Sequence, residues 1–333
     1  MRILFAGSPA ITVPSLNAVF DLEINGKRVT LAGILTNPDS RRRRKGEPEP
    51  TELSAAASKL NLIRHEMGQT SIIQLKPEKL DIQAREEVNT LSPDLLVCFA
   101  YGRIFGPRFL SLFPLGGINI HPSLLPKYRG ASPIPAAILA RDKETGICIQ
   151  KLAPEMDNGD ILASESFQLS GRETSSSLSE IMAEKAAILL RDLLLDFPAR
   201  ASKAKPQTGE VTYCCEIGKE AGFINWYKSA AEIDAQIRAF TPWPLSFTKF
   251  GEDLLFLLEA EVFEMGSGDR GSAETAVPGT VLGTDKEKGV LIQTGDGILA
   301  VSRLQRQAKK ALDWKAFYNG ERNFIGASLA YHS

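Results

Sequence analysis

Short apolar runs that alternate with helical segments constrain this chain more than any other feature of its sequence. The runs are residues 2–7, 29–36, 94–99, 117–121 and 145–152, and helix-forming stretches follow them at 9–20, 51–60, 76–91, 132–141 and 177–195. A strand that is apolar at nearly every position is buried on both faces, as in a parallel sheet covered by helices. The amino-terminal part, residues 1–197, is therefore predicted to be an α/β domain with a mostly parallel sheet.

Residues 117–130 combine a buried strand with polar side chains and then break into a loop. Because successive side chains of a strand point to opposite faces, Asn119 and His121 are expected on the same side of the sheet. Pro122 ends the strand, so the amide and the imidazole lie at its carboxyl end, where open α/β sheets bind their ligands. The alternative for a lone histidine at such a place is a partly buried side chain that bonds a backbone carbonyl.

The string Asn-x-His-Pro-Ser-Leu-Leu-Pro in this run, followed by Tyr-Arg-Gly, resembles the signature of the folate-dependent formyltransferases. The resemblance implies a Rossmann-like formyltransferase domain in which Asn119, His121 and Asp157 are catalytic. It also implies 10-formyltetrahydrofolate as the formyl donor, and a reaction that requires no metal. The residues expected at the folate are Ser123, Leu124, Leu125 and Pro126 of the loop, with Phe99, Ala100 and Tyr101 at the end of the preceding strand.

These three catalytic candidates suit the attack of an amine on a formyl carbonyl. Asn119 can donate its amide N–H to the developing oxyanion without carrying charge. His121 can polarise the same oxygen and transfer protons near neutral pH. Asp157 can orient and stabilise the imidazole while it receives, through water, the proton that the attacking ammonium loses. Alternatively, Asp157 and Asp160 brace a tight Asn-Gly turn; we expect that role for Asp160, and catalysis for Asp157 because it completes the set.

Composition indicates a globular protein, and the lack of a signal-peptide core or membrane span places it in the cytoplasm as an expectation. The chain is 43% hydrophobic and 24% charged, and its formal net charge is -1. This balance gives no global field that would attract nucleic acid, so such binding must come from local patches. The four cysteines, two of them within predicted strands, lack the spacing of a zinc site and are expected to be reduced. No stretch has the length of a signal-peptide core or a membrane span.

The pattern changes after residue 197. Residues 198–207 carry basic residues and no large apolar side chain, so they are predicted to be a linker. From 208 to 333, a helix at 230–240 precedes short strands that are separated by Gly-containing turns, which indicates a small β-barrel, OB-like domain. Its motifs around Trp226 and Trp243 resemble the carboxyl-terminal, tRNA-binding domain of the methionyl-tRNA formyltransferases. Such indoles can stack on bases, or they can form the core of the barrel.

A run of five cations leaves the second predicted strand at its carboxyl end. Most runs of this kind are solvated surface, but an insertion at this place resembles one in the tRNA-dependent formyltransferases. The resemblance therefore implies methionyl-initiator tRNA as the partner. Two alternatives stay open. The acceptor is a sugar nucleotide or another small amine, or the chain is a catalytically silent module that binds folate or RNA. The residues expected to bind tRNA are Arg41, Arg42, Arg43, Arg44, Lys45, Lys203 and Lys205.

Overall fold

The computed structural model describes residues 1–41, 46–264, 276–321 and 323–329. Contacts between residues divide the chain into two compact units. The first contains residues 1–133, 144–168 and 179–215, and the second contains 134–143, 169–178 and 216–333. The predicted domain boundaries at 197 and 207 stay a prediction. Each unit is described below by itself.

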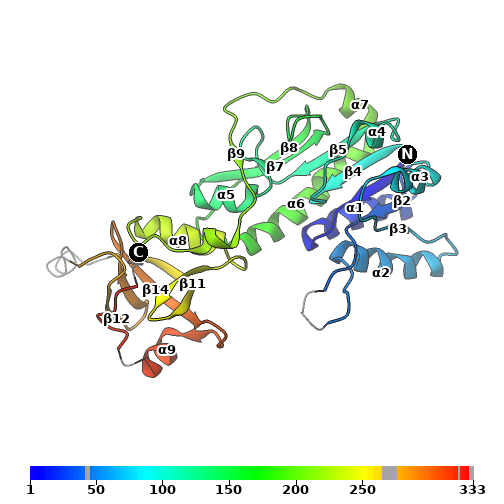
Figure 1. Cartoon of the computed structure of the whole chain (residues 1–333). Coiled ribbons are helices and arrows are strands. Elements are labelled where there is room, and N and C mark those ends of the chain that lie inside the picture. Colours follow the sequence, from blue (N-terminus) through cyan, green and yellow to red (C-terminus); the bar gives the residue numbers. More distant parts are fainter. Residues whose placement is uncertain (42–45, 265–275, 322, 330–333) are drawn as a thin grey trace. The chain divides into compact units, whose positions relative to one another are not determined.

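The first unit is built on a seven-stranded sheet with the order β3-β2-β1-β4-β5-β7-β8. Five strands are parallel, and the last two run antiparallel to their neighbours (Figure 1). This confirms the predicted mostly parallel sheet. The strands are β1 (Arg2–Ala6), β2 (Thr30–Leu35), β3 (Ile73–Leu75), β4 (Leu95–Phe99), β5 (Gly117–His121), β7 (Glu144–Lys151) and β8 (Ile161–Gln168).

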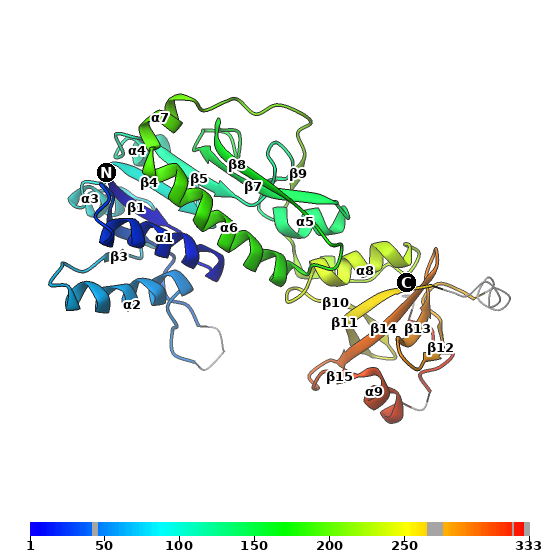
Figure 2. The ribbon, with the colours of Figure 1, turned by 180° about the vertical axis from the view of Figure 1, so that it is seen from behind.

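Helices cover both faces of this sheet. Figure 2 shows α1 and α6 along one face. On the other face, Val88 of α3 and Phe109 of α4 join one buried cluster with strand residues such as Leu4 and Leu96. Strands enclosed in this way must be apolar on both sides, as the sequence indicated. The helices of this unit are η1 (Ala10–Thr12), α1 (Val13–Ile24), α2 (Glu52–Glu66), α3 (Ile82–Thr90), α4 (Pro107–Leu110), α6 (Ser175–Leu195), whose first turn is counted with the second unit, and α7 (Phe197–Ser202). Helix α5 (Pro133–Leu139) belongs to the second unit from its second residue on.

Side-chain caps explain where two of these helices begin. Thr51 accepts a hydrogen bond from the backbone of Ser54 at the start of α2, and Asp81 accepts one from Ala84 at the start of α3. A cap of this kind satisfies a backbone N–H that has no partner within the helix. Helix α3 lies within residues 76–91, where the second helix was predicted, and the Asp81 cap determines where it begins.

The segment after α7 returns along the first unit. In Figures 1 and 2 it runs from α7 back past β8 and ends at β9 (Tyr213–Cys214). Strand β9 pairs in parallel with β6 (Arg129–Gly130), and Lys205 pairs with Ile161 at the start of β8. We call residues 205–214 the strap, because hydrogen bonds join both ends of the segment to the first unit.

The second unit contains an antiparallel sheet with the strand order β10-β11-β14-β13-β12, and β15 pairs with β14. Helix α8 contributes Ile233 and Ile237 to its core, and the capping box of Ser229 and Glu232 begins this helix. An antiparallel carboxyl-terminal unit after the parallel sheet agrees with the predicted fold class. Its elements are η2 (Lys219–Gly222), α8 (Ala230–Ala239), β10 (Ser246–Phe250), β11 (Asp253–Phe263), β12 (Val281–Asp285), β13 (Gly289–Gln293), β14 (Ile298–Arg306), β15 (Leu312–Asp313) and α9 (Trp314–Gly320).

The two tryptophans considered for base stacking lie in different surroundings. The side chain of Trp226 is buried, and its indole N–H lies within hydrogen-bonding distance of the Thr248 hydroxyl and the Leu329 carbonyl, both at 3.1 Å. Trp226 therefore belongs to the core, which was the alternative to a role in stacking. Trp243 is 59% exposed and is the one of this pair that solvent can reach.

Candidate active site

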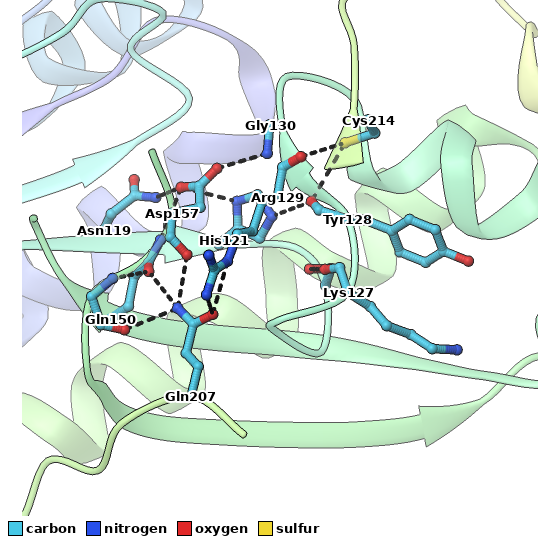
Figure 3. Close-up of polar contacts among 12 residues, drawn as sticks. Asn119, His121, Lys127, Tyr128, Arg129, Gly130, Gln150, Asp157, Gln207 and Cys214 are labelled. Atoms are coloured by element: carbon cyan, nitrogen blue, oxygen red, sulfur yellow. Dashed lines mark hydrogen bonds and ion pairs between the residues drawn. The ribbon is translucent and has the colours of Figure 1, made fainter. Parts of the chain in front are cut away.

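Three polar side chains meet at the carboxyl end of β5 (Figure 3). Asn119 and His121 come from β5 itself, and Asp157 comes from the turn between β7 and β8. The Asn119 Nδ2 lies 3.4 Å from Asp157 Oδ1, and the His121 Nδ1 lies 3.6 Å from the same oxygen. The alternation of β5 places Asn119 and His121 on one side of the strand, because Ile118 and Ile120 occupy the other. The sequence-predicted trio is thus brought together.

The surroundings of His121 fix which ring nitrogen carries its proton. The Nε2 atom lies 2.8 Å from the carbonyl oxygen of Tyr128, and a carbonyl can only accept a hydrogen bond. The proton of the neutral ring is therefore on Nε2, and the lone pair of Nδ1 faces Asp157. Burial lowers the pKa of His121 from its usual value, and this effect outweighs the opposite influences of Asp157 and of the Tyr128 carbonyl. The imidazole is neutral near pH 7, with a basic nitrogen toward the carboxylate.

Besides the long contact from Asn119, two shorter hydrogen bonds hold the carboxylate of Asp157. Its Oδ2 accepts from the backbone N–H of Gly130 at 2.8 Å, and its Oδ1 accepts from Gln150 Nε2 at 2.9 Å. The residue has φ = 51°, a left-handed conformation that is costly for a side chain with a Cβ. Gly159 closes the same turn so tightly that a Cβ would lie 1.7 Å from the carbonyl oxygen of Lys151. The turn therefore needs glycine at that position.

Asp160, which we expected to brace the turn, lies outside the trio. Its carboxylate is 3.4 Å from Lys151 Nζ, and its carbonyl accepts from the Lys151 backbone. Both contacts join the two arms of the β7–β8 connection. Asp160 therefore makes the contacts of a turn residue.

The residues expected at the folate differ in exposure. Ser123 is buried, and its hydroxyl donates to the carbonyl of Lys127 at 2.6 Å, so it shapes the loop after β5. Ala100 is exposed, whereas Phe99 and Tyr101 are buried. The ring of Tyr101 stacks on Phe105 at 5.4 Å between centroids. In the same loop Leu124 and Leu125 are half-buried and Pro126 is buried.

The residues expected to bind tRNA are only partly described. Arg41 is exposed at the end of the segment that follows β2. Arg42, Arg43, Arg44 and Lys45 lie outside the described residues. Lys203 and Lys205 are exposed, at the end of α7 and at the beginning of the strap.

Sequence reasoning did not identify the polar side chains around the trio. Gln150 is buried and stands opposite Asn119 in the antiparallel register of β5 and β7. Its signal was a glutamine inside an apolar strand. Arg129 and Gly130 belong to the Tyr-Arg-Gly part of the motif, but no role had been assigned to them. Gln207 lies in the stretch predicted as a linker, and no local pattern marked it.

The described residues form neither a metal-binding cluster nor a membrane-spanning helix. No group of three or more histidine, cysteine or acidic side chains is arranged to hold a metal ion there. Among the described helices, none combines the length and the apolar character needed to cross a membrane.

The four cysteines form no disulfides. Burial raises the pKa of Cys98 to about 12 and that of Cys148 to about 11, so both thiols are protonated.

Comparison with known proteins gives two family matches. Residues 1–194 match the Formyl transferase model, and residues 216–322 match the model for the Formyl transferase C-terminal domain. Methionyl-tRNA formyltransferase of Treponema denticola is 47% identical over 326 residues, which are 98% of each chain. Methionyl-tRNA formyltransferase of Treponema pallidum (strain Nichols) is 41% identical over 321 residues, 96% of each chain.

Solved structures show the same fold at low sequence identity. HypX from Aquifex aeolicus in complex with tetrahydrofolic acid has a TM-score of 0.62 and 16% identity, over 98% of this chain and 48% of that one. An N-formyltransferase from Helicobacter canadensis, in complex with folinic acid and dTDP-3-aminofucose, has a TM-score of 0.60 and 17% identity, over 92% and 100%. With both family models matched and close relatives aligned along nearly their whole length, the chain belongs to the methionyl-tRNA formyltransferase family.

Proposed function

We propose that the chain transfers the formyl group of 10-formyltetrahydrofolate to the α-amino group of methionyl-initiator tRNA, in the cytoplasm and for translation initiation. The observation that carries the proposal is the convergence of Asn119, His121 and Asp157 at the carboxyl end of β5, in a chain aligned almost end to end with methionyl-tRNA formyltransferases. An amide donor, a neutral imidazole and a carboxylate are the groups that acyl transfer to an amine requires.

The tautomer of His121 supports a role in moving protons. The amine nitrogen attacks the formyl carbon, and its lost proton passes to the lone pair of Nδ1, directly or through water. Asp157, 3.6 Å away, stabilises the imidazolium that forms. The imidazolium then donates this proton to the departing folate nitrogen as the bond between that nitrogen and the formyl carbon breaks. His121 ends in the neutral form in which it began.

Asn119 supplies the contact to the oxyanion. One of its two amide hydrogens is directed to Asp157 at a long 3.4 Å, so the other is available to the oxygen of the tetrahedral intermediate. A preorganised donor of this kind typically stabilises the transition state by about 3 kcal/mol. Because Asn119 carries no charge, it does not disturb the protonation of the neighbouring imidazole.

Recognition of tRNA is assigned to cations and to the second domain. The segment that follows β2 leaves the strand at its carboxyl end, the edge of the sheet where His121 lies, and Arg41 is exposed in this segment. In the sequence, four more cations follow Arg41. Positively charged loops bind phosphates and release counterions. In the second unit Tyr227 and Trp243 are exposed, at 67% and 59%, and are suited to stacking on bases. Lys203 and Lys205, both exposed at the beginning of the strap or just before it, are further cations that can contact phosphates.

A panel of acceptors tests the proposed function. Purified protein is mixed with labelled 10-formyltetrahydrofolate and, in parallel, with methionyl-initiator tRNA, an amino sugar nucleotide or glycinamide ribonucleotide. We expect transfer to the charged tRNA with a kcat/KM at least a thousandfold above that for either small amine. Preferred transfer to a small amine would contradict the assignment of the acceptor, and a His121→Ala variant run in parallel controls for contaminating enzyme.

A further inference from the structure

We propose that Gln207, on the strap, is a positioning residue that holds the Asp157 turn in its active geometry. This inference rests on the proposed function, because it concerns the same formyl transfer. Gln207 does not belong to β5, to the loop after it or to the Asp157 turn. It reaches the site from a segment that lies fifty residues beyond Asp157 in the chain. Figure 3 shows the Gln207 side chain beside Asp157 and Gln150.

The amide of Gln207 contacts both carbonyls that flank Asn158. Its Nε2 lies 2.7 Å from the carbonyl oxygen of Asp157 and 2.9 Å from that of Gly159. An NH2 group has two hydrogens, so one side chain can satisfy both carbonyls at once. The turn is thereby tied on both sides of its tip.

Arg129 determines which way this amide faces. The guanidinium approaches Gln207 Oε1 through Nη2 at 2.7 Å and through Nε at 3.1 Å. A guanidinium only donates hydrogen bonds and the turn carbonyls only accept them, so the oxygen must face Arg129 and the NH2 group must face the turn. The opposite orientation would place donor against donor and acceptor against acceptor. The amide of Gln207 therefore has one stable orientation.

Gln207 also acts on the carboxylate of Asp157 through Gln150. The Oε1 of Gln150 accepts from the backbone of Gly159 at 3.1 Å. It also lies 3.2 Å from Gln207 Nε2, whose two hydrogens are shared among three acceptors, the two turn carbonyls being the nearer ones. With its oxygen fixed in this way, Gln150 directs its own Nε2 to Asp157 Oδ1 at 2.9 Å. The backbone and the side chain of Asp157 are thus controlled by one connected set of amides.

The strap itself is held on either side of Gln207. The Lys205 backbone exchanges hydrogen bonds with Ile161, at 3.0 and 2.8 Å. Further along, the carbonyl of Thr212 accepts from the Arg129 backbone at 2.9 Å. Gly130 permits this approach, because a Cβ there would lie 2.1 Å from the carbonyl oxygen of Cys214. A side chain on a segment fixed at both ends can place its amide with little freedom.

Asp157 needs such support because its backbone conformation is unfavourable. A residue other than glycine in the left-handed region costs roughly 1–3 kcal/mol and persists only where its surroundings enforce it. Without Gln207 the carbonyl of Asp157 loses a donor, and the turn can relax toward a more common conformation. The carboxylate would then leave the N–H of Gly130 and move relative to the imidazole. A misplacement of about 1 Å can lower a rate about a hundredfold.

The test uses the variant Gln207→Met, in which the side chain keeps nearly its size but loses its hydrogen-bond donors and acceptor. We expect kcat for formylation of methionyl-initiator tRNA to fall 10- to 100-fold, while KM for the tRNA and for the folate changes less than threefold. Thr208→Ala, an exposed neighbour on the strap, is the matched control and should retain the wild-type kcat. A wild-type kcat in Gln207→Met, or an equal loss in both variants, overturns the proposal.

A double-mutant cycle separates positioning from local structure. If Gln207 acts through Asp157, then Gln207→Met should cause less than a twofold further loss in an Asp157→Ala background. The full 10- to 100-fold loss in that background would overturn the proposal, because Gln207 would then act independently of Asp157.

A crystal structure of Gln207→Met tests the inference without any assay. We expect the Asp157 carboxylate to have left the N–H of Gly130; an unchanged turn overturns the proposal. This readout does not depend on the acceptor. A wild-type enzyme that fails to formylate charged tRNA would therefore refute the proposed function, and the geometry of the variant would still decide the role of Gln207.

Discussion

Substitution of Asp157 by asparagine removes one charge and one hydrogen-bond acceptor from the site. The amide has nearly the size of the carboxylate, but only one of its two terminal atoms accepts hydrogen bonds. If its oxygen faces Gln150 Nε2, its NH2 group is directed at the backbone N–H of Gly130, which loses its acceptor. An unsatisfied donor of this kind costs about 1–3 kcal/mol. We expect the variant to fold with a free energy of unfolding reduced by about that amount.

The effect on catalysis follows from the distance between Asp157 and the imidazole. Two opposite unit charges 3.6 Å apart attract each other by about 4–5 kcal/mol at the effective dielectric constant near 20 that suits protein sites. In the proposed mechanism this attraction stabilises the imidazolium, and it is lost in the amide variant. At about 1.4 kcal/mol per factor of ten, the predicted fall in kcat is about a thousandfold.

The assay is transfer of labelled formyl from 10-formyltetrahydrofolate to methionyl-initiator tRNA at saturating concentrations of both. Asp160→Asn is the matched control, because its carboxylate lies in the same turn, is 42% exposed and contacts Lys151 instead of His121. The control should stay within threefold of wild type. A fall of less than tenfold in Asp157→Asn, or a similar fall in both variants, would refute this account of the carboxylate.

Three further predictions concern tRNA, the core and pH. Replacing Arg41 through Arg44 by alanine should strongly lower kcat/KM for charged tRNA and flatten its logarithmic salt dependence by a few units of slope, with KM for folate unchanged; equal slopes would leave the run as solvated surface. Trp226→Ala should lower the free energy of unfolding, measured by urea denaturation, by about 3–5 kcal/mol. Trp243→Ala should lower it by less than about 0.5 kcal/mol, because this side chain is exposed. Equal losses in the two variants would contradict the difference in burial. Because burial lowers the pKa of His121 in the folded state, the unfolded chain binds its proton more readily, so folding stability should fall as pH drops through about 6.5, the pKa of a free histidine. A His121→Gln variant should lose less stability than wild type between pH 7.5 and 5.5; an identical loss would show that His121 does not contribute.

The sequence was sufficient to predict the parallel sheet and two members of the trio. Apolar runs define buried strands directly, and strand alternation puts Asn119 and His121 on one side. Asp157 was found only through the family resemblance, because no local rule places a turn after β7 against the end of β5. Nδ1 of His121 is unprotonated because Nε2 donates to the Tyr128 carbonyl. This contact could be predicted only from the path of the loop after β5.

The strap could not be predicted because its structure comes from distant contacts. The two residues of β9 pair with β6 more than eighty positions earlier in the chain, and a strand of two residues has no periodicity. Helix α7 occupies part of the stretch expected to be a linker; its first residue, Phe197, is buried, and Pro198 suits the first turn. The composition of residues 198–207 resembles that of a linker, and only tertiary contacts reveal Gln207.

The most direct test of the central claim is single-turnover formylation of methionyl-initiator tRNA by wild type, Asn119→Ala, His121→Ala, Asp157→Ala and the triple variant. The account predicts rapid transfer by wild type, losses of roughly 10²–10⁴ in each single variant, and a loss in the triple variant no larger than about that of the worst single one, because the three side chains act as a unit. A single variant with near-normal turnover, or a triple variant whose loss equals the product of the three, would contradict it.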